Sequence, residues 1–147
     1  MTGKNIPLVN RIEFPFQEGQ HLHRQRDLHD RFGGNRQSGI APCANYPFVF
    51  LFSSTIGRTH GYADGWLADD VFLFSGESQY GDMEMKRGNR AIADHAKDSR
   101  ELHLFKKVSS GVYAYLGQFA CESHTLLAGE DTEGRARTMI QFRLRKL

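Results

Sequence analysis

The sequence predicts one α+β domain over residues 1–147, built on a strongly curved β-sheet or β-barrel with two or more short flanking helices. Its 147 residues are enough for one hydrophobic core and too few for two. Fifteen glycines and 12% aromatic residues are typical of a chain rich in strands and turns. About seven short strand patterns and two short helix patterns follow one another, which favours the α+β class.

The first strand patterns lie in the N-terminal half. Apolar and other residues alternate over residues 12–16 and predict a short half-buried strand, within or just after an N-terminal extension of residues 1–19. The apolar run at residues 46–52 predicts a buried strand, and residues 71–75 predict another. We expect Trp66, between these two, to belong to the core.

The C-terminal half has the clearest strand patterns. Residues 102–108 and 112–119 flank Ser109-Ser110-Gly111 and predict a β-hairpin. The last segment alternates with a period of two, which is the period of a strand. One face of it carries Ile140, Phe142 and Leu144, and the other carries Met139, Gln141, Arg143 and Arg145.

Two segments predict short helices. Leu28 and Phe32 are four residues apart among charged residues, so residues 24–32 predict a helix that Gly33-Gly34 ends. Residues 33–39 then form a loop by composition. A second short helix is predicted over residues 89–97, with Asn89 as its N-cap.

Charge is unevenly distributed, although the net charge is only +2. Arginines gather in residues 24–36, and the last thirteen residues hold five basic residues and no carboxylate. Between Thr59 and Met85 there is no Lys or Arg, but there are six carboxylates. Basic flanks suit a polyanion backbone, whereas an acidic middle suits a neutral hydrogen-bond donor. Scattered solvated charge is the alternative interpretation.

Several classes of protein are excluded. No apolar run approaches the ~20 residues of a membrane helix, and the first residues lack the apolar stretch of a signal peptide. Two cysteines, Cys43 and Cys121, are too few for a disulfide framework or a four-thiolate zinc site. We therefore expect a protein of the reducing cytoplasm with no membrane partner.

The usual catalytic and cofactor motifs are missing. Cys121 and His124 are spaced to lie on opposite faces of a strand, so we expect an ordinary half-buried cysteine. Among seven histidines, His21, His23 and His29 form the nearest group, but no cysteine or carboxylate accompanies them at a zinc-like spacing. We expect no cofactor, no metal site and no catalytic residue in this chain.

A set of ordered blocks in the middle of the chain is more specific. The blocks read Gly61-Tyr62-Ala63-Asp64, then Phe74-Ser75-Gly76, Gly81-Asp82-Met83 and Asn89-Arg90-Ala91-Ile92. Upstream, Arg26-Asp27-Leu28-His29 is followed by Gly33-Gly34 and Gly39-Ile40. Over residues 20–144 this pattern resembles the SRA domain, also called the YDG domain, of eukaryotic methyl-DNA readers and bacterial modification-dependent restriction proteins. The resemblance implies the curved SRA/PUA-like fold.

The resemblance also implies a pocket for a modified cytosine that has been flipped out of the duplex. Tyr62 and Phe74, twelve residues apart, match the two aromatic residues that stack on the base. Asp64 matches the carboxylate that accepts a hydrogen bond from the exocyclic amine. Backbone groups at the strand end complete the base edge, and they match Ser75, Gly76 and Glu77.

Further residues match the part of the family that contacts the double helix. Arg36 and Gln37, just before Gly39-Ile40, match the loop that enters the groove where the base has left. The phosphate contacts are expected from Arg24, Arg26, Arg36, Arg90 and the last strand. Only six residues separate Asp82 from Asn89, so the long finger loop of eukaryotic members is absent and the bacterial branch is favoured.

Elementary energetics agree with such a pocket. Extruding a base costs a few kcal/mol, and stacking on an aromatic face returns ~1–3 kcal/mol per base. A carboxylate accepts from cytosine N4 but opposes thymine O4, which is itself an acceptor. Burying one methyl group contributes only ~0.8 kcal/mol, about a fourfold preference. Stronger selectivity for the modified base therefore requires pocket shape.

The leading hypothesis is a non-catalytic, nucleoid-associated reader of double-stranded DNA carrying modified cytosine, foremost 5-methylcytosine. Bacterial members are often joined to an HNH nuclease, so a fused or associated nuclease domain is expected for the full-length protein. Two alternatives remain open. One is an RNA-binding barrel module of the PUA-like class, and the other is a small metal enzyme built on His21, His23 and His29.

Overall fold

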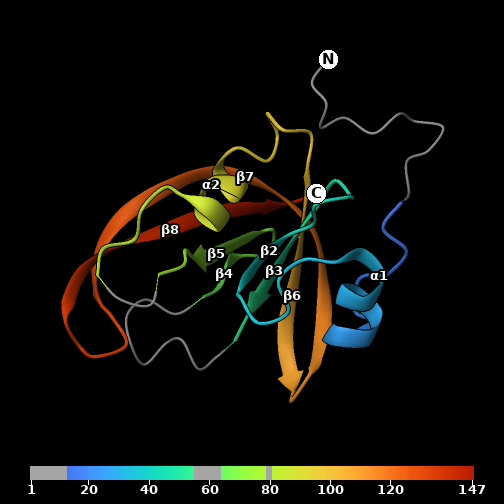
Figure 1. Cartoon of the computed structure of the whole chain (residues 1–147). Coiled ribbons are helices and arrows are strands. Elements are labelled where there is room, and N and C mark those ends of the chain that lie inside the picture. Colours follow the sequence, from blue (N-terminus) through green and yellow to red (C-terminus); the bar gives the residue numbers. More distant parts are fainter. Residues whose placement is uncertain (1–12, 55–63, 79–80) are drawn as a thin grey trace.

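The computed structural model describes residues 13–54, 64–78 and 81–147 (Figure 1). These residues form an eight-stranded sheet of β1 (His21–His23), β2 (Ile40–Pro42), β3 (Phe48–Ser53), β4 (Gly65–Ala68), β5 (Val71–Ser75), β6 (Glu101–Ser109), β7 (Val112–Glu130) and β8 (Ala136–Lys146). The strand order is β2-β3-β6-β7-β8-β5-β4, and β1 pairs with β7 outside this path. The pair β3–β6 is parallel and the other pairs are antiparallel. The predicted α+β class is confirmed.

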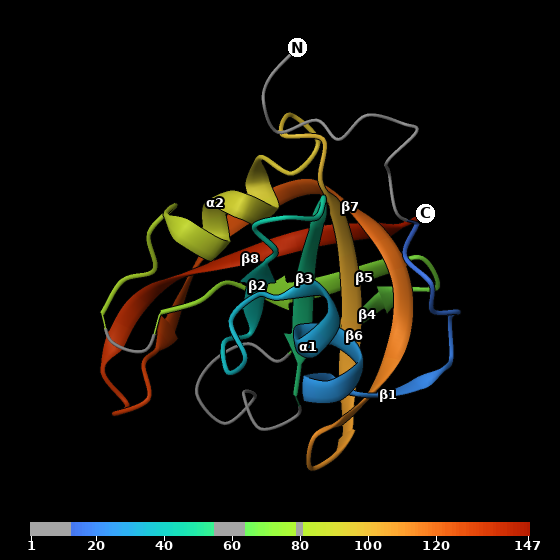
Figure 2. The same ribbon diagram turned by 45° about the vertical axis from the view of Figure 1, so that its right-hand side comes forward.

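The sheet is strongly curved because β7 is long and bent (Figures 1 and 2). The first part of this 19-residue strand pairs with β6, and the rest pairs with β8. The register shifts between Leu104 and Phe105, opposite Gly117, and again between Cys121 and Ser123. Such bulges increase the local twist and bend a strand. Gly117 has a φ of 117°, a conformation that favours glycine over L side chains.

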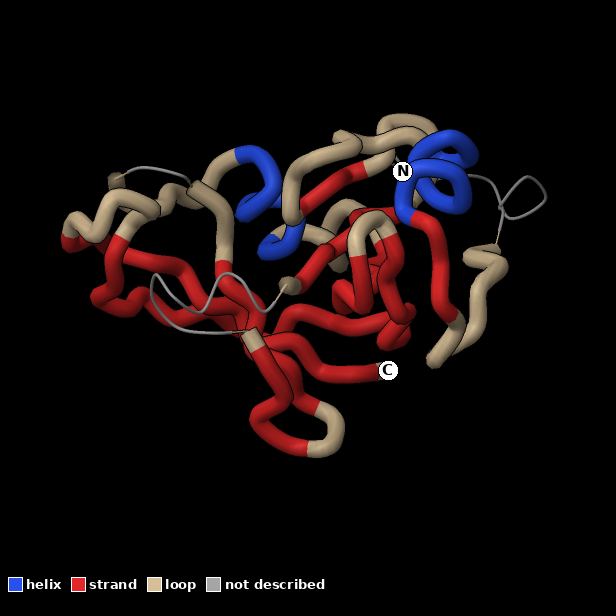
Figure 3. The backbone as a smooth tube through the Cα atoms, turned by 90° about the horizontal axis from the view of Figure 1, so that it is seen from below, coloured by secondary structure: helices blue, strands red, loops and turns tan. Residues whose placement is uncertain are grey.

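The described residues also form three helical segments (Figure 3): the π-helix η2 (Arg24–His29), the α-helical turn α1 (Asp30–Phe32) and α2 (Arg87–Ala93). Residues of η2 and α1 pack on one face of β3, and α2 packs with residues of its other face. An aromatic cluster that includes Phe48, Phe50 and Phe105 holds residues of η2 and α1 against β3 and β6. A second cluster packs Ile92 of α2 with Phe142 of β8. Burying one such side chain stabilises the fold by about 1.5–3 kcal/mol. The two clusters therefore hold the helices firmly on the sheet.

Two predictions about aromatic residues are wrong. Residues 13–16 belong to no strand, although residues 12–16 were expected to form one; residue 12 lies outside the described residues. Phe14 is held instead by side-chain packing, with its ring stacked on His103 at a centroid distance of 4.0 Å. Trp66, expected in the core, is 44% exposed because it lies on the edge strand β4, where its ring contacts Phe72 and Phe119.

The other predicted strands are confirmed with shifted ends. Residues 71–75 coincide with β5, and the predicted hairpin turns at Gly111, whose φ is 75°. The alternation of β8 holds for Ile140, but Met139, predicted on the opposite face, is also buried. The reason is the neighbouring Gly129 of β7: a Cβ atom there would lie 2.1 Å from the Met139 sulfur, so the missing side chain makes room for it.

The helices differ from the prediction in detail. The single helix expected over residues 24–32 is a π-helix followed by one α-helical turn, and it does end at Gly33, whose φ is 83°. The second helix spans Arg87–Ala93, so it starts two residues before the predicted residue 89. No helix of the described residues is long and apolar enough to cross a membrane.

Two buried histidines make stability depend on pH. His103 and His29 are 1% and 3% exposed, and burial lowers the pKa of both below the usual 6.5. The unfolded chain therefore takes up protons near pH 6.5 while the folded chain does not, so stability is lost as the pH falls through that value. We expect the free energy of unfolding in urea to decrease from pH 7.5 to 5.5. Imidazole NMR signals of either residue that titrate at or above pH 6.5 in the folded protein would contradict this.

Candidate functional site

A cavity of about 910 Å³ opens between the end of β5, the segment that leads into α2 and the start of β8. Its volume lies near the upper end of the ~300–1,000 Å³ typical of small-molecule sites. The wall combines aromatic rings of Phe52 and Phe74 with the thioethers of Met83 and Met139, and Asp64 lies among these apolar groups. An apolar wall with a fixed polar group is the composition of a site for a flat, partly polar ligand.

Asp64 is held by residues of β3 and β5, two strands that are not adjacent in the sheet. Its Oδ1 accepts a hydrogen bond from the backbone N–H of Ser75 at 2.7 Å, and its Oδ2 accepts one from the Ser53 hydroxyl at 3.0 Å. Each carboxylate oxygen has two acceptor positions, so acceptor capacity remains for a ligand. Burial raises the pKa of Asp64 more strongly than these hydrogen bonds lower it. A partly desolvated carboxylate on a rigid support is suited to bind a hydrogen-bond donor.

The end of β5 provides the aromatic wall. Phe74 is 2% exposed and packs within the second apolar cluster, yet its side chain also lines the cavity. Tyr62, predicted as the second stacking residue, lies outside the described residues. The paired stacking role of Tyr62 and Phe74 therefore stays a prediction.

The amide groups that follow Phe74 are used inside the fold. The Ser75 N–H donates to Asp64, the Gly76 N–H donates to the carbonyl of Ile140 at 2.8 Å, and the Glu77 N–H donates to Asn89 Oδ1 at 2.8 Å. Donors with these partners are not free to read a base edge. All three residues still line the cavity, so their predicted contribution to the site rests on groups other than the amide N–H.

Glu77 places a second carboxylate at the cavity. Its Oε2 accepts a hydrogen bond from the Gly88 N–H at 3.1 Å, and burial raises the pKa of its carboxyl group. A Cβ atom at Gly88 would lie 2.5 Å from this Oε2 and 2.9 Å from Ile40. Glycine at position 88 therefore lets the first turn of α2 approach Glu77 and β2 closely.

Asn89 connects the cavity rim to α2 and is 1% exposed. Besides accepting from Glu77 N–H, its amide donates to the carbonyls of Glu77 and Glu84 at 3.0 and 2.8 Å. The predicted N-cap role is wrong, because Lys86 occupies the N-cap and the Asn89 side chain bonds to the backbone of Glu77 and Glu84 instead. Its three hydrogen bonds instead fix the segment that forms one side of the cavity.

Arg24 was expected to contact phosphate, but it is 6% exposed and its guanidinium is used in the fold. It lies 3.6 Å from the centre of the Phe52 ring, and burial lowers its pKa. It donates to His29 Nε2 at 2.8 Å and to the carbonyls of Asn35 and Ser38 at 3.1 and 2.7 Å. Arg24 therefore positions the loop before β2, because a buried guanidinium with these partners is not presented to a phosphate.

The other residues predicted to contact DNA are exposed. Arg36 forms an ion pair with Asp30 at 2.7 Å and Gln37 follows it in the same loop. Arg26 pairs with its neighbour in sequence, Asp27, and Arg90 of α2 lies 3.5 Å from Asp94. Surface ion pairs of this kind contribute ~0–1 kcal/mol, so a phosphate can replace the carboxylate partner at little cost.

The histidine cluster does not form a metal site. His29 Nδ1 is 2.8 Å from the Gly33 carbonyl and its Nε2 accepts from Arg24, so both ring nitrogens have partners. Among the described residues, which include His21 and His23, no three His, Cys, Asp or Glu side chains are placed to hold a metal ion.

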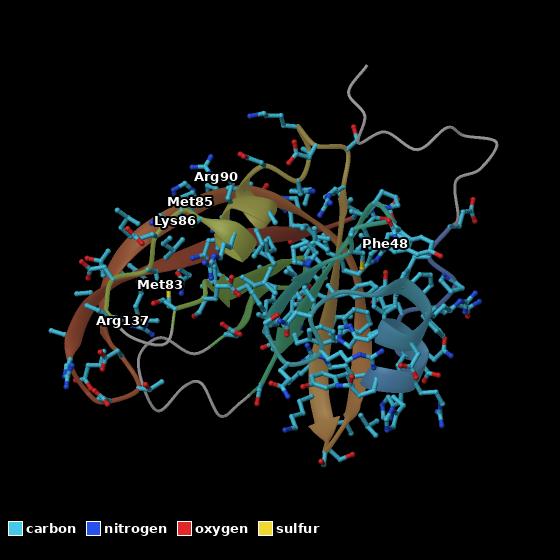
Figure 4. All side chains as sticks on the ribbon, viewed as in Figure 1. Phe48, Met83, Met85, Lys86, Arg90 and Arg137 are labelled. Atoms are coloured by element: carbon cyan, nitrogen blue, oxygen red, sulfur yellow. The ribbon has the colours of Figure 1, made fainter. Side chains whose placement is uncertain are left out.

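Sequence reasoning missed several residues at the cavity. Met83, Met139, Lys86, Arg87 and Arg137 line it beside the predicted Asp64, Phe74, Ser75, Gly76 and Glu77. Figure 4 shows Lys86 near the start of α2, and Arg137 and Met83 nearer the turn between β7 and β8. The basic C-terminal segment was a sequence signal for Arg137, but its position beside the cavity depends on the long pairing of β7 with β8.

Several solved structures that contain SRA domains share this fold. The sulfur-binding and SRA domains of ScoMcrA complexed with phosphorothioated DNA superpose with a TM-score of 0.72 and 22% identity, over 90% of this chain and 40% of that one. The type IV phosphorothioation-dependent restriction endonuclease ScoMcrA superposes with a TM-score of 0.73 and 22% identity, over 90% of this chain and 28% of that one. The SUVH5 SRA domain in complex with methylated CHH DNA superposes with a TM-score of 0.65 and 18% identity, over 89% of this chain and 88% of that one.

The chain belongs to the ScoMcrA-like SRA domain family, whose model matches residues 18–147. This confirms the resemblance seen in the sequence, including its bacterial, restriction-associated branch. No match was found among the curated proteins. The chain spans less than half the length of the two ScoMcrA chains.

Proposed function

We propose that this chain is a non-catalytic reader domain that flips a modified cytosine, foremost 5-methylcytosine, out of double-stranded DNA and binds it in the cavity. Family membership supports a DNA-binding role, and the similar structures include complexes with phosphorothioated and with methylated DNA. Because one similar chain is a longer restriction endonuclease, we further propose that this chain targets a fused or associated nuclease, of the HNH type, to modified DNA associated with the nucleoid.

The observation that carries the proposal is the Asp64 carboxylate, fixed by Ser53 and Ser75 beside Phe74 at the cavity. Its remaining acceptor positions can bind the N4 amino group of cytosine, whereas thymine presents the acceptor O4 and is repelled. The thioethers of Met83 and Met139 supply an apolar wall suited to a methyl group. A cavity of this size also holds a whole nucleobase, which is what base flipping requires.

Stacking must return the energy lost when the base leaves the helix. An aromatic face contributes ~1–3 kcal/mol per stacked base, so two faces offset the few kcal/mol of extrusion. Phe74 supplies one face in the proposal and Tyr62 the other. The exposed Arg26, Arg36, Gln37 and Arg90 are proposed to contact the groove and the phosphates.

Fluorescence anisotropy with matched duplexes tests the function. The labelled duplexes differ only in one 5-methyl group, and a structured RNA of equal length competes. We expect the methylated duplex to bind at least about fourfold more tightly, since one buried methyl contributes ~0.8 kcal/mol. Tyr62→Ala should lower the affinity for it about tenfold through lost stacking. The exposed Trp66, replaced by Ala, is the matched aromatic control. Equal binding of both duplexes, or stronger competition by RNA, would contradict the proposal.

A further inference from the structure

Arg137 differs from the other basic residues of the C-terminal segment. Arg135 pairs with Glu133, Arg143 and Arg145 pair with Glu122, and Lys146 pairs with Glu18. In the part of the chain that the structure describes, Arg137 has no carboxylate within ion-pair distance. Among the described residues, Arg137 is therefore the basic residue of this segment that has no carboxylate partner.

Hydrogen bonds from one nitrogen atom, Nη1, hold the Arg137 guanidinium at the cavity. Its Nη1 donates to the carbonyls of Ser78 and Gly81 at 2.5 and 3.4 Å, which hold it against the segment after β5. Its Nε is buried, and within the described residues it has no hydrogen-bond partner. A buried N–H without a partner is unfavourable, and such a group in a native fold calls for a ligand or a bound solvent molecule.

The surroundings of Arg137 indicate the charge of the acceptor that its free N–H groups would bind. Arginine stays charged at all physiological pH values, so its free donors require an acceptor, preferably an anion. The four carboxylates that line the cavity have other partners. Asp64 accepts from Ser53 and Ser75, and Glu77 accepts from the Gly88 N–H. Asp82 accepts from the Thr138 N–H at 2.7 Å, and Glu84 pairs with Lys86 at 3.1 Å. An anionic group of a bound ligand supplies such an acceptor.

Building on the proposed function, we propose that Arg137 binds a phosphate of the flipped nucleotide. A base that enters the cavity brings its own phosphates to the entrance, and a guanidinium matches the geometry of phosphate oxygens through two parallel N–H donors. Arg137 then contacts the phosphate of any nucleotide bound in the site, whether or not the base carries a methyl group at C5. Its contact adds affinity without adding selectivity for the modification.

The test measures DNA binding of Arg137→Gln against salt concentration, with methylated and unmethylated duplexes. We expect both affinities to fall by a similar factor, roughly tenfold at low salt, and the slope of log K against log salt to become shallower by about 0.9. Arg143→Gln is the matched control, because this residue lies on the same strand and pairs with Glu122. Its slope should stay closer to that of the unmodified protein.

Each outcome decides the assignment. Wild-type affinity and slope in Arg137→Gln overturn it, and so does a loss confined to the methylated duplex, which indicates a contact with the base. If the glutamine variant unfolds, Arg137→Lys decides: a retained slope with reduced affinity supports the phosphate contact, and unchanged affinity overturns it. A wild-type protein that binds both duplexes equally contradicts the proposed function alone, provided that Arg137→Gln still lowers the slope.

Discussion

Asp64→Asn is expected to weaken binding of the methylated duplex by roughly ten- to a hundredfold, which corresponds to the ~1–3 kcal/mol of a discriminating base contact. The asparagine can keep both supporting contacts, because its carbonyl can accept from the Ser75 N–H and its amide can donate to the Ser53 hydroxyl. The substitution therefore changes one acceptor into a donor, which opposes the amino group of cytosine. Fluorescence anisotropy with the matched duplexes measures the effect.

The stability of Asp64→Asn should move in the opposite direction. Burial raises the pKa of Asp64, so ionisation is less favourable in the folded chain than in the unfolded chain. Stability contributed by such an acid is lost as the pH rises from the pKa of the unfolded chain through the higher pKa of the folded chain. Removing the ionisable group should leave the free energy of unfolding at pH 7 unchanged or higher. Weaker binding accompanied by lower stability would point to a structural role for Asp64.

Asn89→Ala is expected to lower the free energy of unfolding by about 3 kcal/mol or more. The change leaves the Glu77 N–H and the carbonyls of Glu77 and Glu84 without their partner, and each buried orphan group costs ~1–3 kcal/mol. Because Asn89 is 1% exposed, water cannot readily replace it. Equilibrium unfolding in urea measures the loss.

Asn35→Ala is the matched control for this prediction. Asn35 Oδ1 also accepts backbone hydrogen bonds, from Gln37 and Ser38 at 2.8 and 2.9 Å, but in an exposed turn where water can take its place. We expect a loss of about 1 kcal/mol or less there. Equal losses in the two variants would show that Asn89 does not hold the cavity rim. DNA affinity should fall for Asn89→Ala even where the variant is folded, because the Glu77 segment is released.

Local patterns in the sequence were sufficient for several conclusions. The period of two over residues 139–145 and the turn at Gly111 follow from side-chain alternation and from the backbone freedom of glycine, so they could be read without the structure. The ordered blocks from Gly61 to Ile92, with those from Arg26 to Ile40 upstream, likewise identified the SRA resemblance, which the family match confirms. They also named Asp64 and Phe74, which do line the cavity.

Contacts between distant segments could not be predicted. Arg24 and Arg36 are alike as sequence, but the aromatic ring of Phe52 and two loop carbonyls bury the first and leave the second at the surface. Trp66 is exposed because β4 is an edge strand, a position that no local pattern encodes.

The sequence by itself thus determined the fold class, the family and the residue types of the site, because these depend on short-range periodicity and on ordered motifs. Only the tertiary structure decided that Arg137 reaches the cavity and that Asn89 joins its rim to α2. Both depend on how a bent 19-residue strand and the segment after β5 come together. Hydrogen bonds between residues so far apart in the chain, such as Arg137 and Ser78, depend on the packing of the whole sheet rather than on neighbouring residues.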